Sequence, residues 1–198
     1  MREFFCKKTC CYIRDTDLAD FTKWVIMKKI PDIFFNSPAS STGRYHPKYS
    51  NTQHGLMLHS IANCHYVIEL ARGGIPYFVN SNRDILIVAE VCHDVEKSNY
   101  KIHAEKAAEN VGIWIDEFNK FKEKEVISAD TKEKICKSIL SHMGIFGVTK
   151  PSADEQWAVY LADLISSFKV YEQMEDVLAE IKFKEGEFDV DTSGRAEA

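Results

Sequence analysis

Residues 85–97 read ILIVAEVCHDVEK, an apolar run interrupted only by Glu90 and followed by a histidine, an aspartate and, three residues after the aspartate, a lysine. Apolar periodicity alone leaves this run open between a buried strand and a buried helix. The preceding Asn80 and Ser81, Asp84 in the first turn and a length of about a dozen residues favour a helix, because these are helix-start signals. We therefore expect a buried helix that carries a His-Asp pair.

Helical spacing and capping residues recur on both sides of this segment, and no stretch alternates apolar and polar residues between hairpin turns. The expected fold is all-α, a single-domain bundle of about six to eight helices. The domain spans 1–183, with an N-terminal helix over 15–30 and a core over about 44–169; the patternless 184–198 is expected to be a flexible acidic tail. Within the N-terminal helix the periodic pattern covers Asp15–Lys29. The other expected helices are His54–Arg72, His103–Lys120, Thr131–His142, Asp154–Phe168 and Tyr171–Phe183.

The composition excludes several classes of protein. The 198 residues carry a formal net charge of -5, which disfavours a long nucleic acid as partner. No apolar run approaches the roughly 18 residues that cross a bilayer, and the first residues lack a signal-peptide core. None of the six cysteines forms a CxxC pair, so reduced thiols are expected. These features predict a soluble, cytoplasmic protein without a membrane partner.

Five of the expected helices carry an imidazole or a carboxylate on their apolar side. One such histidine is ordinarily a core residue bonded to the backbone, but five together need partners, since each unsatisfied buried polar group costs about 1–3 kcal/mol. A divalent ion would satisfy them together. Nitrogen and oxygen ligands suit Mn, Fe, Zn, Ni, Co or Mg rather than a sulfur-bound structural zinc. The five residues are His59, His93, His103, His142 and Asp163.

The order of these residues resembles a known family. His59, the adjacent His93 and Asp94, and then Asp163 follow the H…HD…D signature of the HD-domain superfamily of metal-dependent phosphohydrolases. The sequence VCHDVEK, which contains the His-Asp pair, is similar to the family's apolar-HD-x-x-K segment, although Glu96 stands where many members have glycine.

Two further segments strengthen this likeness, which covers about residues 44–169. Residues 45–47 read YHP and residues 141–144 read SHMG, as in small stand-alone HD proteins of bacteria and their phages. The resemblance implies an all-α metal-dependent enzyme with one or two ions, the two sites sharing a bridging aspartate. One ion would be bound by His59, His93, Asp94 and Asp163, and the second by Asp94, His103 and His142.

Other residues are candidates for contacts with substrate. Lys97 follows Asp94 by three residues, so on a continued helix it would reach the same centre and neutralise phosphate; with Asp94 it is the expected catalytic residue. Arg44, His46 and Lys48 place positive charge in the long loop before the first ligand helix, as expected for phosphate binding, although loop solvation explains each equally well.

Further positions are expected to have no direct role in the chemistry. Glu90 lies four residues before Asp94 and could support a ligand of the centre, although a glutamate on the helix surface is the preferred interpretation. His54 and His65 are interpreted as structural histidines that point away from the direction of His59.

The implied activity is hydrolysis of a phosphoester of a small phosphorylated substrate, a nucleotide in the first place, by metal-activated water. Three alternatives stay open. The same chemistry would serve a phosphodiesterase or a 3′-5′ exonuclease on cyclic or short oligonucleotides. A module that senses nucleotides without turning them over would keep the same metal ligands, and the ion could also be purely structural.

Overall fold

The computed structural model describes residues 1–40, 46–72, 82–97, 102–168, 177 and 181. These residues form eight α-helices and three short 3-10 helices, and contain no strand, so the predicted all-α class is confirmed. The α-helices are α1 (Arg2–Thr9), α2 (Thr16–Lys28), α3 (Asp32–Asn36), α4 (Gly55–Arg72), α5 (Arg83–Cys92), α6 (His103–Phe121), α7 (Ala129–Leu140) and α8 (Asp154–Phe168), and the 3-10 helices are Cys10–Tyr12, Lys48–Asn51 and Gly144–Phe146.

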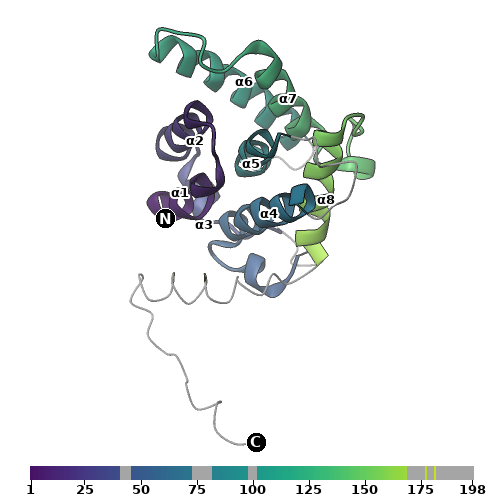
Figure 1. Ribbon diagram of the computed structural model, residues 1–198. Coiled ribbons are helices and arrows are strands. Elements are labelled where there is room, and N and C mark those ends of the chain that lie inside the picture. Colours follow the sequence, from purple (N-terminus) through teal and green to yellow (C-terminus); the bar gives the residue numbers. More distant parts are fainter. Residues whose placement is uncertain (41–45, 73–81, 98–101, 169–176, 178–180, 182–198) are drawn as a thin grey trace, which may run out of the picture.

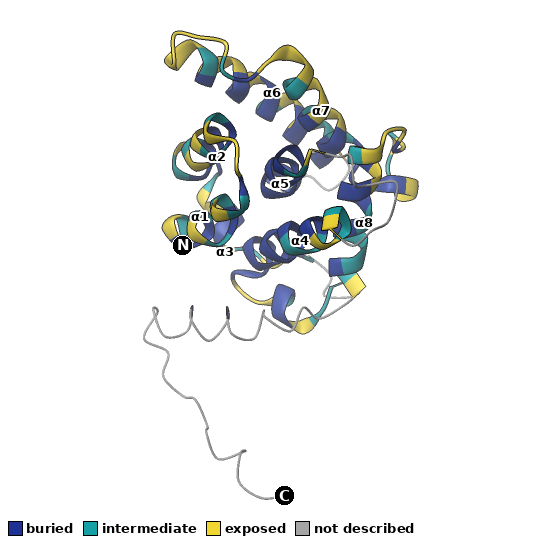
Figure 2. Ribbon diagram, viewed as in Figure 1, coloured by how far each residue is buried: buried dark blue, intermediate teal, exposed yellow. Residues whose placement is uncertain are grey.

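Helix α5 is the centre of the bundle (Figure 1), where it packs against α2, α4, α7 and α8. Every residue from Asp84 to Cys92 is buried, as the dark colour of α5 in Figure 2 shows. Asn82 caps this helix by accepting hydrogen bonds from the backbone N–H groups of Asp84 and Ile85. The expected cap, Asn80 and Ser81, lies outside the described residues. A side-chain cap at its first turn is what makes this apolar run a helix.

The N-terminal part of the chain contains two helices that the sequence pattern did not predict, α1 and α3. Both are short, and each contributes a pair of buried aromatic residues to the core. The ring centroids of Phe5 and Phe34 lie 5.5 Å apart, and those of Phe5 and Phe35 lie 6.0 Å apart. Helices of this length are marginal in isolation, so these two are stabilised by tertiary packing, which periodicity does not report.

The start of α4 is held tightly against the segment that precedes it. The Leu56 N–H donates to the Ser37 carbonyl at 2.9 Å, and the Ala39 N–H donates to the Ser50 carbonyl at 2.7 Å. A Cβ atom on Gly55 would lie only 1.9 Å from the same Ser50 oxygen, so only glycine allows this approach. The contact places the first ligand helix relative to the long loop before it, of which residues 41–45 lie outside the description.

The remaining expectations can be compared with the described residues. Asp154–Phe168 is confirmed as α8 at both ends, and Asp15 caps α2 as expected. The predicted helix Tyr171–Phe183 falls almost entirely outside the description, and the tail 184–198 lies wholly outside it. All six cysteines are free thiols. In the described part of the chain, no helix combines the length and the apolar character that crossing a bilayer requires.

Candidate metal centre

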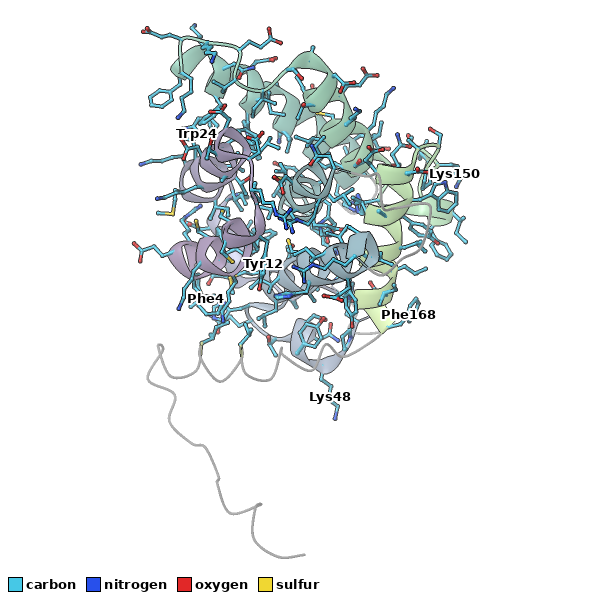
Figure 3. The ribbon with its side chains drawn as sticks, in the orientation of Figure 1. Phe4, Tyr12, Trp24, Lys48, Lys150 and Phe168 are labelled. Atoms are coloured by element: carbon cyan, nitrogen blue, oxygen red, sulfur yellow. The ribbon has the colours of Figure 1, made fainter. Side chains whose placement is uncertain are left out.

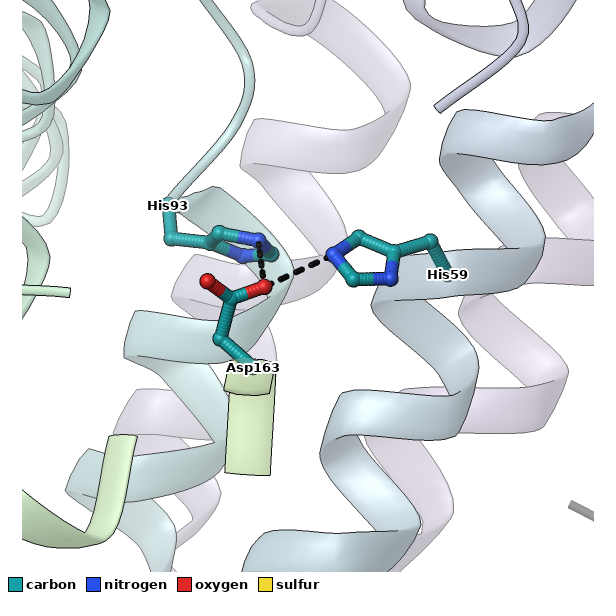
Figure 4. A group of neighbouring side chains, drawn as sticks. All are labelled: His59, His93 and Asp163. Carbon is teal, nitrogen blue, oxygen red and sulfur yellow. Dashed lines mark hydrogen bonds and ion pairs between the residues drawn. The ribbon is translucent and has the colours of Figure 1, made fainter. Parts of the chain in front are cut away.

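Three of the expected ligands meet at one point of the bundle although they come from three different helices (Figure 4). His59 lies on α4, His93 immediately follows α5, and Asp163 lies on α8. The Oδ1 atom of Asp163 lies 2.8 Å from His59 Nε2 and 3.8 Å from His93 Nε2. We refer to these three residues as the first donor group, since they offer nitrogen and oxygen ligands within reach of a single ion.

The other three expected ligands form a second donor group next to the first. His103 is the first residue of α6, and His142 lies in the turn after α7. Their Nε2 atoms are 3.0 Å apart and lie 3.3 Å and 3.7 Å from Asp94 Oδ1, with all three residues buried. The sequence-derived ligands are therefore all brought together, in two groups of three.

Asp94 belongs to the second donor group and also lies next to the first. Its Oδ1 atom faces the second group, while its Oδ2 atom lies 3.4 Å from His93 Nε2 in the first group. Helix α5 ends at Cys92, and residues 94–97 form a turn rather than the continued helix that we expected. His93 keeps helical backbone angles, and successive residues of a helix point in different directions, so His93 faces the first group while Asp94 reaches both.

The histidine tautomers follow from hydrogen bonds to the backbone. His93 Nδ1 lies 2.8 Å from the Glu90 carbonyl oxygen, and His142 Nδ1 lies 2.7 Å from the Ile139 carbonyl oxygen. A carbonyl only accepts, so each Nδ1 carries a hydrogen and donates it. The Nε2 atom of each neutral ring then directs a lone pair toward the donor groups, which is the arrangement of a metal-ligating histidine.

Ser166 would support the same tautomer in His59 when an ion is bound. The Ser166 hydroxyl donates its hydrogen to the Asp163 carbonyl at 2.9 Å, so it accepts from His59 Nδ1 at 3.2 Å. In this tautomer the lone pair of His59 Nε2 faces the Asp163 carboxylate oxygen 2.8 Å away. Burial lowers the pKa of His59 despite the opposing effect of Asp163, so a second proton on this ring is disfavoured. In the metal-free protein, however, a 2.8 Å contact between an imidazole nitrogen and a carboxylate oxygen is the distance of an ordinary hydrogen bond, which a bound ion would replace.

Orphaned polar atoms also fit a bound cation. Asp94 Oδ1 is buried and accepts no hydrogen bond, although it belongs to a carboxylate that is almost fully buried. Although Lys97 pairs with the other oxygen of this carboxylate, a buried acceptor without a hydrogen bond is unfavourable. Three imidazole nitrogens with directed lone pairs and two carboxylates are a donor set that suits Zn, Mn, Fe, Co or Ni. The residues present therefore fit one or two divalent ions.

The charges at the centre shift the pKa values of its members. Burial lowers the pKa of His93, but Asp94 and the nearby carboxyl groups of Glu90 and Asp163 outweigh burial and raise it to about 9. Burial raises the pKa of Asp94, but Lys97 and the imidazoles of His93 and His103 hold it well below its usual value. Asp94 is thus ionised near neutral pH, and an ion that binds at the centre must displace a proton from His93.

The candidate substrate-binding residues differ in their positions. The Lys97 ammonium donates a hydrogen bond to Asp94 Oδ2, which places this side chain at the centre. The ring of His46 packs edge-on against His59, with their centroids 4.7 Å apart. Lys48 is exposed, and Figure 3 shows its side chain pointing away from the helical body. Arg44 lies outside the described residues.

Sequence reasoning missed three residues of the centre. Glu90 is completely buried beside His93, so its interpretation as a surface residue was wrong. Asn63 and Ser166 are also fully buried and contact the first donor group. Asn63 lies four residues after His59 and Ser166 lies three after Asp163, so helical spacing from the ligands could have found both.

Comparison of the chain with protein-family models, with curated proteins and with solved structures finds no match.

Proposed function

We propose that this chain is a metal-dependent phosphohydrolase of the HD type, which hydrolyses a phosphoester bond of a small phosphorylated substrate, with nucleotides as the first candidates. The observation that carries the proposal is that Asp94 belongs to one donor group and also lies next to the other. Neighbouring divalent ions that share a carboxylate are well suited to phosphoryl transfer, since they can stabilise both the attacking and the leaving oxygen. The His-Asp pair and the order of the ligands along the chain support the same conclusion.

Divalent ions held by these residues would supply Lewis acidity, lowering the pKa of a bound water and polarising a phosphoryl oxygen. The chain itself holds the ligands in place. Backbone carbonyls orient His93 and His142 through their Nδ1 hydrogens, and Ser166 orients His59. Lys97 pairs with the Oδ2 atom of Asp94 and adds a positive charge beside the centre. This charge would favour the binding of a substrate phosphate.

The partly exposed residues indicate the side from which a substrate would approach. The side chains of Asp163, in the first donor group, and of the neighbouring Lys97 are 18% and 20% exposed, whereas the other five donor residues are almost completely buried. His46 lies next to His59, and burial lowers its pKa to about 3, so its ring is neutral at pH 7. Its Nδ1 atom has no hydrogen-bond partner and can bond a substrate hydroxyl or a water.

The test begins with metal analysis of the purified protein, followed by phosphate-release and product assays with nucleotides, cyclic nucleotides and dinucleotides in the presence of Mn²⁺, Co²⁺ or Zn²⁺. Asp94→Asn keeps the shape of the side chain but removes its charge, and is expected to reduce turnover by about 100-fold or more. His65→Gln is the matched control, since His65 packs on Tyr12 away from the centre and should leave turnover unchanged.

Each outcome distinguishes the proposal from its alternatives. Unchanged turnover in Asp94→Asn would contradict it. Tight nucleotide binding without any product over long incubation would select a sensing module instead. A preference for oligonucleotides that weakens steeply with salt would select an exonuclease. The net charge of -5 favours the small substrate, because a polymer would meet little positive charge on the chain.

A further inference from the structure

Asn63 occupies a central position in the first donor group. It lies one helical turn after His59 on α4, and its side chain is completely buried. The terminal nitrogen of its amide lies 3.4 Å from His59 Nε2, 3.3 Å from His93 Nε2 and 3.4 Å from Asp163 Oδ1. One amide group therefore faces all three members of the group at nearly equal distances.

The amide group of Asn63 forms only weak hydrogen bonds as a donor in these three contacts. All of them are longer than the usual 2.9–3.0 Å for N–H···O bonds, and two hydrogens cannot serve three acceptors well. The Asn63 oxygen meanwhile is buried without any hydrogen-bond partner. A half-turn about the Cβ–Cγ bond exchanges the two atoms without changing the shape of the side chain. The oxygen then faces the imidazole nitrogens and the carboxylate.

The distances from the Asn63 amide to the other three donor atoms match those between the ligands of a four-coordinate ion. Donors placed about 2.0–2.1 Å from a tetrahedral ion are separated from one another by about 3.3–3.4 Å. The amide terminus of Asn63 has these separations from each of the other three donor atoms. It thus stands where a fourth ligand would stand relative to His59, His93 and Asp163.

The surroundings of Asn63 favour the same orientation. The carboxyl group of Glu90 is completely buried and close enough to the Asn63 amide to interact with it, and neither of its oxygens has a hydrogen bond of good geometry. If the Asn63 oxygen is directed at an ion, the amide nitrogen takes the position that the unpartnered Asn63 oxygen has in this structure, in the buried region that also contains Glu90. The exchange removes an orphaned acceptor and directs a neutral oxygen at the ion without adding charge.

We propose that Asn63 supplies its side-chain oxygen as a further ligand, beside the bridging Asp94, to the divalent ion held by His59, His93 and Asp163. The inference rests on the metal centre of the proposed function, but it does not depend on which reaction that centre performs.

The test measures metal binding rather than turnover. Co²⁺ is titrated into the metal-free protein, and affinity and d–d absorption are recorded for the wild type, Asn63→Leu, which removes the oxygen at similar size, and Asn63→Asp, which keeps an oxygen. Asn63→Leu is expected to weaken one class of site by about 10–100-fold and to change its spectrum, whereas Asn63→Asp retains tight binding. Asn110→Leu is the matched control, since Asn110 bonds Glu96 rather than a ligand.

Wild-type affinity and an unchanged spectrum in Asn63→Leu would overturn the inference. If that variant does not fold, a crystal structure of the wild type with Zn²⁺ decides: an Asn63 oxygen about 2.0–2.2 Å from the ion supports the inference, and one beyond about 3 Å overturns it. Absence of metal binding in the wild type would reject both this ligand and the metal centre. An ion bound by Asn63 in a protein that hydrolyses no phosphoester would reject only the proposed function.

Discussion

The Nε2 atoms of His103 and His142 lie 3.0 Å apart, in a buried position between the first turn of α6 and the turn after α7. Since His142 donates its Nδ1 hydrogen to the Ile139 carbonyl, its Nε2 atom presents a lone pair to the other ring. Asp94 lies beside both rings. A cation at this point would be bound by all three side chains, separately from an ion in the first donor group.

We expect the wild type to bind two equivalents of divalent ion and His103→Ala to bind one, because this substitution removes a ligand of the second donor group only. His59→Ala is the counterpart in the first group, and should also leave one equivalent. Elemental analysis after dialysis measures the ratio of metal to protein. Two equivalents in both variants would show that these groups are not the binding sites.

The ion pair between Lys97 and Asp94 should be important for stability when the metal is absent. Lys97→Met leaves a buried carboxylate without its cation, which is expected to lower the free energy of unfolding of the metal-free protein by about 3 kcal/mol. A bound divalent ion replaces the missing charge, so added Zn²⁺ should raise the melting temperature of this variant more than that of the wild type.

The control for this prediction is Lys132→Met. Lys132 pairs with Asp116 on the surface, so its loss should change the free energy of unfolding by less than about 1 kcal/mol. Urea unfolding in the presence of a chelator measures both variants. Equal effects of the two substitutions would mean that the Asp94 pair has no special role.

The metal-free protein should lose stability as the pH falls from about 6.5 to about 4. Burial, followed by the nearby His93, lowers the pKa of His142 to about 4. Between these values the unfolded chain binds a proton at His142 and the folded protein does not, so unfolding becomes easier as the pH falls, by up to about 1.4 kcal/mol per pH unit. The raised pKa of His93 affects stability in a different pH range. Its stabilising effect is lost as the pH rises through about 9, not as the pH falls below 6.5.

Chelator-treated protein is unfolded in urea at several pH values to measure this dependence. His142→Leu removes the titrating ring, so its free energy of unfolding should depend less on pH between 6.5 and 4 than that of the wild type. Parallel pH profiles for the two proteins would exclude His142 as the origin of the acid sensitivity.

Two glycines should respond in opposite directions to substitution by alanine. A Cβ at Gly55 would lie 1.9 Å from the Ser50 carbonyl oxygen, so Gly55→Ala must displace the start of α4 and should destabilise the protein by about 1–3 kcal/mol. A Cβ at Gly112, inside α6, meets its nearest neighbours at 3.5 Å, so Gly112→Ala should stabilise by about 0.5–1 kcal/mol. Thermal unfolding of both variants tests the pair, and the same sign for both would contradict it.

Most of the fold could be predicted from local signals. Asp15 at the start of α2 and the apolar spacing of α8 act within one or two turns of helix, so sequence reasoning placed both elements. The short helices α1 and α3 were not predicted, because the packing of Phe5 against Phe34 stabilises them and this contact joins residues distant in the chain.

The candidate ligands could be chosen from the sequence because a polar residue on an apolar helix face is visible in the spacing itself. Their division into two groups could not, since the distance between His59 and Asp163 depends on how α4 packs against α8. Glu90 illustrates the limit: its helix is covered on every side by other helices, so no face of it remains a surface.

The sequence by itself thus determined the helical class and the side chains able to bind a metal, because capping and periodicity operate between neighbours along the chain. Only the tertiary structure decided that Asp94 lies next to both donor groups, that Ser166 contacts the ring of His59, and that the amide of Asn63 faces the first group. These relationships are set by the packing of α4, α5 and α8, which no spacing within one helix contains.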